Sequence, residues 1–207
     1  MLFRSLREFH EALRQNPNDY YSRYSLGNLL SKLGRVEEAT AEYQRAIAAD
    51  SERPEAHFNL AETYFERKQW EQGVAHYEAA LAHELEPEVA STAHLRLGAF
   101  HTERRAWEKA EKHLLQAVDL GPEDFMTNYC LALVYLNIDW GESGWAARSK
   151  ALLFAKKAME LDPEDEDARE VARAALAALE KARPPSQAAS RQPIASPSRT
   201  WWQFWKR

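Results

Sequence analysis

The sequence predicts an all-α protein, a solenoid of helix-turn-helix repeats followed by a disordered C-terminal tail. Two observations support this prediction. A pattern of small and large apolar residues returns with a period of 34 residues along most of the chain. The composition also favours helices, because Ala, Leu, Glu, Arg and Lys dominate and only 7 of the 207 residues are glycine.

The repeated pattern begins with Leu26-Gly27 in one predicted helix and continues with Ala39, Tyr43 and Ala46 in the next. Its first pair returns in three later units, as Leu60-Ala61, Leu97-Gly98 and Leu131-Ala132. The small residues are expected where two helices cross too closely for a larger side chain. One helix pair cannot bury its apolar stripe alone, whereas stacked neighbours can, so the pattern predicts a repeat array.

These units resemble the tetratricopeptide repeat, whose signature is W-x2-L-G-x2-Y…A-x3-F…A…P. The third unit follows it as His94-x2-Leu97-Gly98-x2-His101…Ala110-x3-Leu114…Ala117…Pro122. The chain departs from the family in that no unit has Trp at the first aromatic position, and Ala155 replaces a large residue in the fourth unit. The resemblance implies a right-handed superhelical solenoid in which the first helix of each repeat, helix A, lines a concave groove.

The predicted organisation has four parts. Residues 1–19 form an N-terminal half-repeat helix, and residues 166–183 form a C-terminal capping helix. Four repeats lie between them, at 20–53, 54–87, 91–124 and 125–165. Residues 184–207 form a flexible linker and an aromatic, basic tail.

The family resemblance implies a scaffold or adaptor that binds a peptide or a partner helix in the groove. The groove candidates on the A helices are Tyr21, Tyr24, Asn28, Phe58, Asn59, Glu62, Leu95, Arg96, Ala99, Tyr129, Leu133 and Asn137. Some family members grip the C-terminal carboxylate of a chaperone with two Lys, two Asn and an Arg. Asn28, Asn59 and Arg96 match three of these positions, but Tyr24 and Thr92 replace the lysines, so a carboxylate clamp remains an alternative.

Catalytic, metal and nucleic-acid chemistry have little support in the sequence, and we expect neither an enzyme nor a cofactor. His57 and His94 occupy one position of successive repeats, and His76 and His113 occupy another, so repetition explains them better than a zinc site does. The acidic run from Asp162 to Asp167 suits the first turn of a helix rather than a metal site. Without its tail the chain has a formal net charge of −9, which disfavours nucleic acid.

The fourth repeat carries an insertion with Trp140 and Trp145. These rings either form an exposed contact patch or fold back over the space that Ala155 leaves, and we prefer the second interpretation.

The tail ends in four large aromatic and two basic residues, Trp201, Trp202, Phe204, Trp205, Lys206 and Arg207. Three interpretations remain open: contact with an anionic membrane surface, docking into a partner, or docking onto the chain's own repeats. The expected location is cytoplasmic, and possible attachment to the periphery of a membrane depends on the tail. The single cysteine, Cys130, implies no disulfide framework. The oligomeric state is left open.

Overall fold

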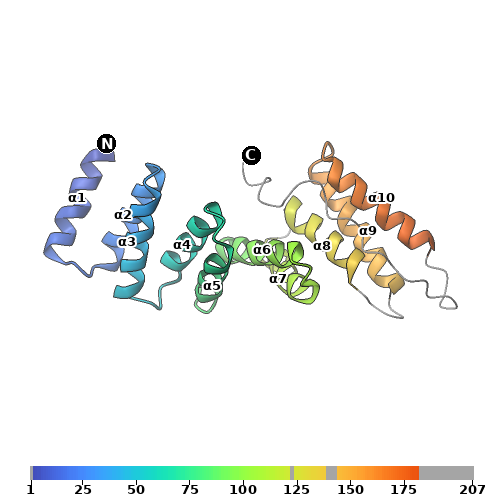
Figure 1. Ribbon diagram of the computed structural model, residues 1–207, viewed down its shortest axis with the longest axis horizontal. Coiled ribbons are helices and arrows are strands. Elements are labelled where there is room, and N and C mark those ends of the chain that lie inside the picture. The colour runs from blue at the N-terminus through green and yellow to red at the C-terminus, as the bar shows by residue number, and fades with distance from the viewer. Residues whose placement is uncertain (1, 122–123, 139–143, 182–207) are drawn as a thin grey trace. The chain divides into compact units, whose positions relative to one another are not determined.

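The computed structural model describes residues 2–121, 124–138 and 144–181, and these residues form ten α-helices and no strand (Figure 1). The helices are α1 Leu2–Gln15, α2 Tyr20–Lys32, α3 Val36–Ala49, α4 Pro54–Glu66, α5 Trp70–Leu81, α6 Pro87–Glu103, α7 Trp107–Leu120, α8 Phe125–Asn137, α9 Gly144–Leu161 and α10 Glu166–Lys181. The all-α prediction is therefore confirmed. None of the described helices combines the length and the apolar character needed to cross a membrane.

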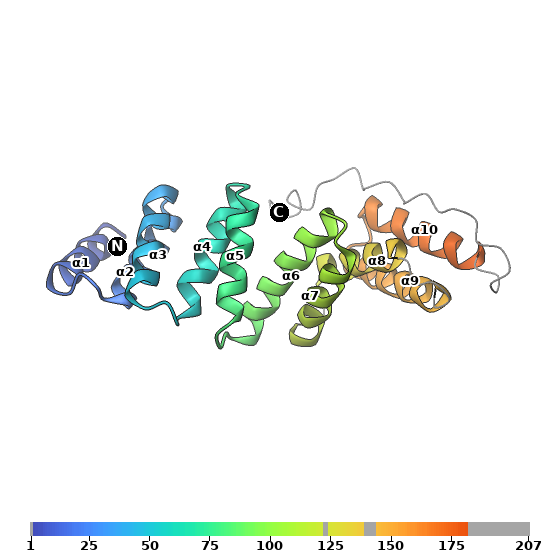
Figure 2. The same cartoon turned by 60° about the horizontal axis from the view of Figure 1, so that its bottom comes forward.

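The chain divides into two compact units, Met1–Glu86 and Pro87–Arg207, which we call unit 1 and unit 2. Unit 1 contains α1 and the helix pairs α2–α3 and α4–α5. Unit 2 contains the pairs α6–α7 and α8–α9, followed by α10. Within each pair the two helices lie side by side in both ribbon views (Figure 2).

Local sequence signals explain where the helices begin. The Asp19 carboxylate accepts a hydrogen bond from the Ser22 amide at 2.7 Å, and the Asp124 carboxylate accepts one from the Thr127 amide at 2.7 Å. Pro54 and Pro87 begin α4 and α6, where a missing amide proton costs nothing. The third helix pair thus begins at residue 87, four residues before the expected repeat boundary, because Pro87 is a good first helical residue.

The turns inside the first three helix pairs also repeat. Gly34, Lys68 and Arg105 occupy equivalent positions and have φ values of 72°, 60° and 56°. Only glycine adopts this left-handed conformation without a steric cost. The three turns therefore share the same left-handed backbone conformation although their residues differ.

The core of unit 1 forms between the helix pairs and includes the N-terminal helix. Leu26 and Leu60 are at most 1% exposed, and the Tyr43 ring fills the space beside them. From α1, Leu6 joins the same cluster, and Phe9 and Leu13 pack against it. The helix α1 therefore packs against the first helix pair.

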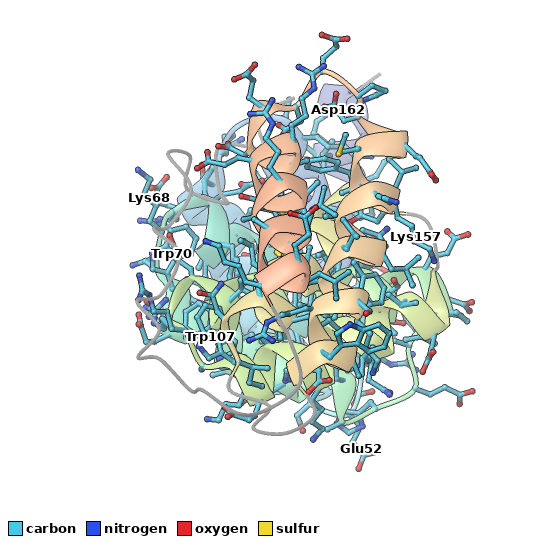
Figure 3. All side chains as sticks on the ribbon, turned by 90° about the vertical axis from the view of Figure 1, so that its right-hand side faces the viewer. Glu52, Lys68, Trp70, Trp107, Lys157 and Asp162 are labelled. Atoms are coloured by element: carbon cyan, nitrogen blue, oxygen red, sulfur yellow. The ribbon has the colours of Figure 1, made fainter. Side chains whose placement is uncertain are left out.

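In unit 2 the core residues occupy the equivalent positions. Leu97, Leu114 and Leu131 are fully buried, and so is Ala158 on α9. Ala168, Val171 and Ala175 form the buried face of α10, which packs against α8 and α9. Asp162, in the turn that precedes α10, is labelled in Figure 3.

Candidate protein-binding face

In unit 1 the candidate side chains of α2 and α4 form one connected polar cluster. The Asn59 amide group donates to the Asn28 side-chain oxygen at 2.7 Å and to the Tyr24 hydroxyl at 3.3 Å. Tyr24, Asn28 and Asn59 are all half-buried, so the cluster lies at the surface without being fully solvated. Two consecutive A helices are thus joined by amide and hydroxyl groups that face an accessible side.

The B helices contribute tyrosine hydroxyls to this face. The Tyr43 hydroxyl donates to the Asn28 side-chain oxygen at 2.8 Å, and the Tyr77 hydroxyl donates to the Glu62 carboxylate. Both tyrosines occupy the same position of their repeats, as do the two acceptors. Burial is the main reason why the pKa of Tyr43 is raised, so its hydroxyl stays protonated and remains a donor.

Tyr43 and Tyr77 were not among the predicted residues of this face, although the sequence contained a signal for them. Where helix B has Leu114 in place of tyrosine, helix A has Ala99 in place of an acceptor. This pairing of donor and acceptor positions between the two helices could have identified the hydrogen bonds.

Aromatic surface flanks the polar cluster. The Tyr21 side chain is 56% exposed and its ring lies beneath the Arg53 guanidinium, 4.6 Å from the ring centroid. On α4 the half-buried Phe58 ring contacts Tyr77 edge to face, with a centroid distance of 5.7 Å. The face therefore combines hydrogen-bonding groups with apolar rings.

The equivalent positions of unit 2 are mostly part of the core. Leu95, Ala99, Tyr129 and Leu133 are between 1% and 8% exposed. Arg96 and Asn137 are half-buried, and the Asn137 amide group donates to the Leu133 carbonyl of its own helix at 2.8 Å. Among the groove candidates of unit 2, all of which the structure describes, Arg96 and Asn137 are thus the two that lie outside the core.

The carboxylate-clamp positions divide between the two units. In unit 1, Tyr24 takes a lysine position and accepts a hydrogen bond from Asn59, so this position supplies no cation. In unit 2, the Thr92 hydroxyl donates to the Glu88 carbonyl of its own helix at 3.0 Å. Asn59 directs its donors toward Asn28 and Tyr24, whereas a clamp needs them to bind the ligand carboxylate.

Trp145 lies in the first turn of α9 and is 61% exposed. The preferred interpretation, in which this ring packs back over the repeats, is therefore wrong for Trp145. Trp140 and the six tail candidates, Trp201, Trp202, Phe204, Trp205, Lys206 and Arg207, lie outside the described residues.

Comparison with known proteins gives a consistent result. Sequence profiles of the tetratricopeptide repeat match residues 9–41 and 58–125, and a profile described as TPR repeat matches residues 27–66. Among curated proteins, none matches the chain by sequence.

Several solved structures share the fold. One is YrrB, described as a TPR protein with an unusual peptide-binding site, with 20% identity and a TM-score of 0.64 over 84% of this chain and 93% of YrrB. Another is MamA from Desulfovibrio magneticus RS-1, with 22% identity and a TM-score of 0.58 over 78% of this chain and 85% of that one. PilW, described as a widely conserved type IV pilus biogenesis factor, has 17% identity and a TM-score of 0.56 over 82% of this chain and 79% of PilW.

Proposed function

The chain belongs to the tetratricopeptide repeat family, and from this premise we propose that it is a non-catalytic adaptor or assembly factor that binds a segment of a protein partner on the A-helix face of unit 1. Proteins of this family bind protein or peptide partners. The family alone does not identify the face or the partner, so the proposal depends on the chemistry of particular residues.

The observation that carries the proposal is the cluster of Tyr24, Asn28 and Asn59 with its aromatic flanks. Asn28 is not part of the core, and its amide group offers donors to a bound peptide backbone. Tyr21 and Phe58 offer apolar rings to the side chains of that peptide. An extended or amphipathic segment needs both kinds of contact.

The solved structures with the same fold support a role in protein interaction. YrrB is described as having a peptide-binding site, and PilW as a factor in pilus biogenesis. Identities of 20% and 17% carry no residue-level correspondence. We therefore take from these proteins only the general role of a scaffold.

A carboxylate-clamp co-chaperone is the weaker alternative. A clamp needs cations at the positions of Tyr24 and Thr92, and it needs the Asn59 amide group free to donate to a carboxylate. A partner recognised through backbone amides and apolar side chains fits the unit 1 face better than a partner recognised through a terminal carboxylate.

We further propose that the tail is a second contact. Its four aromatic rings and its basic residues suit either an anionic membrane surface at the cytoplasmic side or a pocket on a partner. The adaptor would then hold one partner on its repeats while the tail attaches it elsewhere.

The experiment is selection of a random-peptide phage library on the immobilised full chain, followed by affinity measurements on the enriched peptides. We expect Asn28→Ala, Asn59→Ala and Phe58→Ala each to weaken binding on the order of tenfold, which is about 1.4 kcal/mol. Asn137→Ala is the matched control, because its amide group donates within its own helix in unit 2.

Thermal unfolding of each variant separates loss of binding from loss of folding. Peptides whose affinity is unchanged by all three unit 1 substitutions would remove this face from the proposal. An equal loss with Asn137→Ala would show that binding is not confined to unit 1.

A further inference from the structure

Three equivalent positions of the four repeats, two on helix A and one on helix B, supply contacts between the two helices of each pair. We call these three side chains the joint of a repeat. The joints in chain order are Arg23, Leu30 and Glu42; His57, Tyr64 and His76; His94, His101 and His113; and Asn128, Tyr135 and Phe154. The same place in the fold is therefore occupied by four different chemistries.

The first and fourth joints contain no ring that titrates near neutral pH. In the first, the Arg23 guanidinium donates to the Glu42 carboxylate at 2.8 Å, and the two side chains are only 15% and 11% exposed. In the fourth, the Tyr135 and Phe154 rings stack with a centroid distance of 5.7 Å. Opposite charges hold one joint and aromatic packing holds the other.

The second and third joints are built from histidines in direct contact. The Nδ1 atoms of His57 and His76 are 3.0 Å apart, and those of His94 and His113 are also 3.0 Å apart. A third ring stacks on the helix B histidine in both cases. It is Tyr64 at a centroid distance of 5.5 Å in the second joint, and His101 at 5.8 Å in the third.

A hydrogen bond between two Nδ1 atoms needs a proton on one of them and a lone pair on the other. Two doubly protonated rings have no lone pair to offer and carry like charges at contact distance. The pair therefore joins the helices only while at least one ring is neutral. The described residues contain no group of three or more His, Cys, Asp or Glu side chains placed to hold a metal ion, so metal binding is not the favoured role of these rings.

The surroundings of the third joint resist protonation further. Burial is the largest cause that lowers the pKa values of His94, His101 and His113, and it acts with the neighbouring charges to lower that of His113 to about 4. Each charged group that acts on these rings is a cation or another histidine. The cations are Lys109 and Lys112 of α7 and Arg104 after α6.

The helix packed on the other side of this joint supplies no opposing charge to it. From α8, the Tyr135 hydroxyl donates to the Glu111 carboxylate of α7 at 2.8 Å, so the contact that this carboxylate makes with α8 is to a neutral hydroxyl. In the second joint, burial lowers the pKa values of His57 and His76, and His83 after α5 lowers that of His57 further. From α3, the neutral Gln44 amide donates to the Tyr64 hydroxyl at 3.2 Å.

We propose that the second and third joints are acid-sensitive couplings, which hold the two helices of their repeats together at neutral pH and release them when the histidines are protonated. The first and fourth joints lack this sensitivity. Mild acid would then loosen α4–α5 in unit 1 and α6–α7 in unit 2 while the flanking pairs keep their contacts.

The direction of the effect follows from the pKa values. An unfolded histidine has a pKa of about 6.5, and each of these rings has a lower pKa in the folded chain. The unfolded state therefore binds more protons as the pH falls below about 6.5, and stability is lost from there down toward the folded pKa. Each ring that stays neutral lowers the folding equilibrium constant by up to about tenfold per pH unit in this window.

The test is hydrogen exchange of the full chain, resolved by peptide and corrected for intrinsic rates, at about pH 7.5 and about pH 5.5, on either side of the ordinary histidine pKa. We expect protection of α6–α7 to fall on the order of tenfold or more, since the lowered pKa of His113 alone would produce about that change. Protection of α8–α9 should change far less. Equal changes in α6–α7 and α8–α9 would overturn the proposal.

The test variant combines His94→Asn, His101→Tyr and His113→Phe, the residues that the fourth repeat has at the same positions. Protection of α6–α7 should then lose most of its dependence on pH. His10→Asn, which removes an exposed histidine from α1, is the control and should behave as the unmodified chain. Unchanged pH dependence in the triple variant would contradict the proposal.

A direct measurement on the unmodified chain keeps the proposal testable if the triple variant does not fold. Imidazole nitrogen chemical shifts report protonation ring by ring. We expect His113 to remain neutral at about pH 5.5, where an ordinary histidine is charged. Titration of His94 and His113 near the ordinary value of about 6.5 would overturn the proposal.

Discussion

Single glycines decide how closely the helices of a pair approach. At Gly27 an added Cβ atom would lie 2.6 Å from the Tyr43 ring, and at Gly98 it would lie 2.5 Å from Leu114. In the second pair the glycine is on helix B, where Gly73 faces the Phe65 ring. The predicted role of Gly27 and Gly98 at helix crossings is confirmed by these distances.

Gly73→Ala should destabilise unit 1 by about 1–3 kcal/mol, because the new methyl group would overlap the Phe65 ring. That ring cannot easily move, since Trp70 and Tyr77 contact it edge to face at centroid distances of 5.5 and 5.0 Å. Trp70 is labelled in Figure 3, at the start of α5. Urea unfolding measures the loss.

The matched control is the double variant Gly73→Ala, Phe65→Leu, which shortens the obstructing side chain. Part of the stability lost in Gly73→Ala should return relative to Phe65→Leu alone. Strictly additive losses would show that the overlap with Phe65 is not the cause.

Each joint lies within one helix pair. Because the joint positions are equivalent in all four repeats, the side chains of one joint can be introduced into another helix pair by substitution. Arg23→His with Glu42→His would place the histidine pair of the second repeat in the first. We expect the double variant to fold at neutral pH with lower stability, because Arg23 also donates to the Pro17 carbonyl at 2.7 Å.

The informative result is how strongly protection of α2–α3 depends on pH, rather than the absolute stability of the variant. Protection of α2–α3 from hydrogen exchange should become pH-dependent between about pH 7.5 and about pH 5.5, which it is not expected to be in the unmodified chain. Arg23→Lys with Glu42→Asp keeps the charges and is the control. If protection of α2–α3 depends on pH equally in the histidine variant and in this control, a histidine pair alone does not produce acid sensitivity.

At the scale of helices, the sequence predicted the type and order of the elements well, because small residues recur at the helix crossings with a period of 34 residues. It predicted the exposed face less well. Tyr129 fits the groove position of its repeat but is 3% exposed, and the acidic residues Asp165, Asp167 and Glu170 at the start of α10 act on its hydroxyl. Periodicity within one helix does not reveal how far the next helix covers it.

The joints illustrate the same limit. The sequence placed His57 with His94 and His76 with His113 by repetition, but it did not show that the two sets touch each other. The common separation of 19 residues between Arg23 and Glu42, His57 and His76, and His94 and His113 was the available signal. Only the packing of helix A on helix B turns that separation into a contact.

Over the whole chain, charge is distributed unevenly between the repeats and the tail. Residues 184–207 contain four basic residues and no acidic residue, while the chain as a whole has a formal net charge of −5. An anionic lipid surface should therefore repel the repeats and attract the tail.

Liposome flotation of the full chain and of a truncation after Arg183 tests this separation. We expect only the full chain to float with anionic vesicles, and we expect added salt to weaken the association. Replacing Trp201, Trp202, Phe204 and Trp205 with Ala, while keeping Lys206 and Arg207, separates the aromatic contribution from the charge. Absence of flotation for the full chain would leave a partner protein or the chain's own repeats as the target of the tail.

The differences between the joints also affect folding, because a helix of one repeat could associate with a helix of a neighbouring repeat instead of its native partner. Neighbouring repeats with near-identical sequences are prone to misassembly, because a helix can associate with its counterpart from the next repeat. If α2 associated with α5, Arg23 would face His76 without the carboxylate that it contacts in the native pair. Such a charge, excluded from water and unmatched, costs several kcal/mol, on the order of a protein's whole stability. The Arg23–Glu42 pair thus favours association of α2 with α3 over association of α2 with α5 during folding.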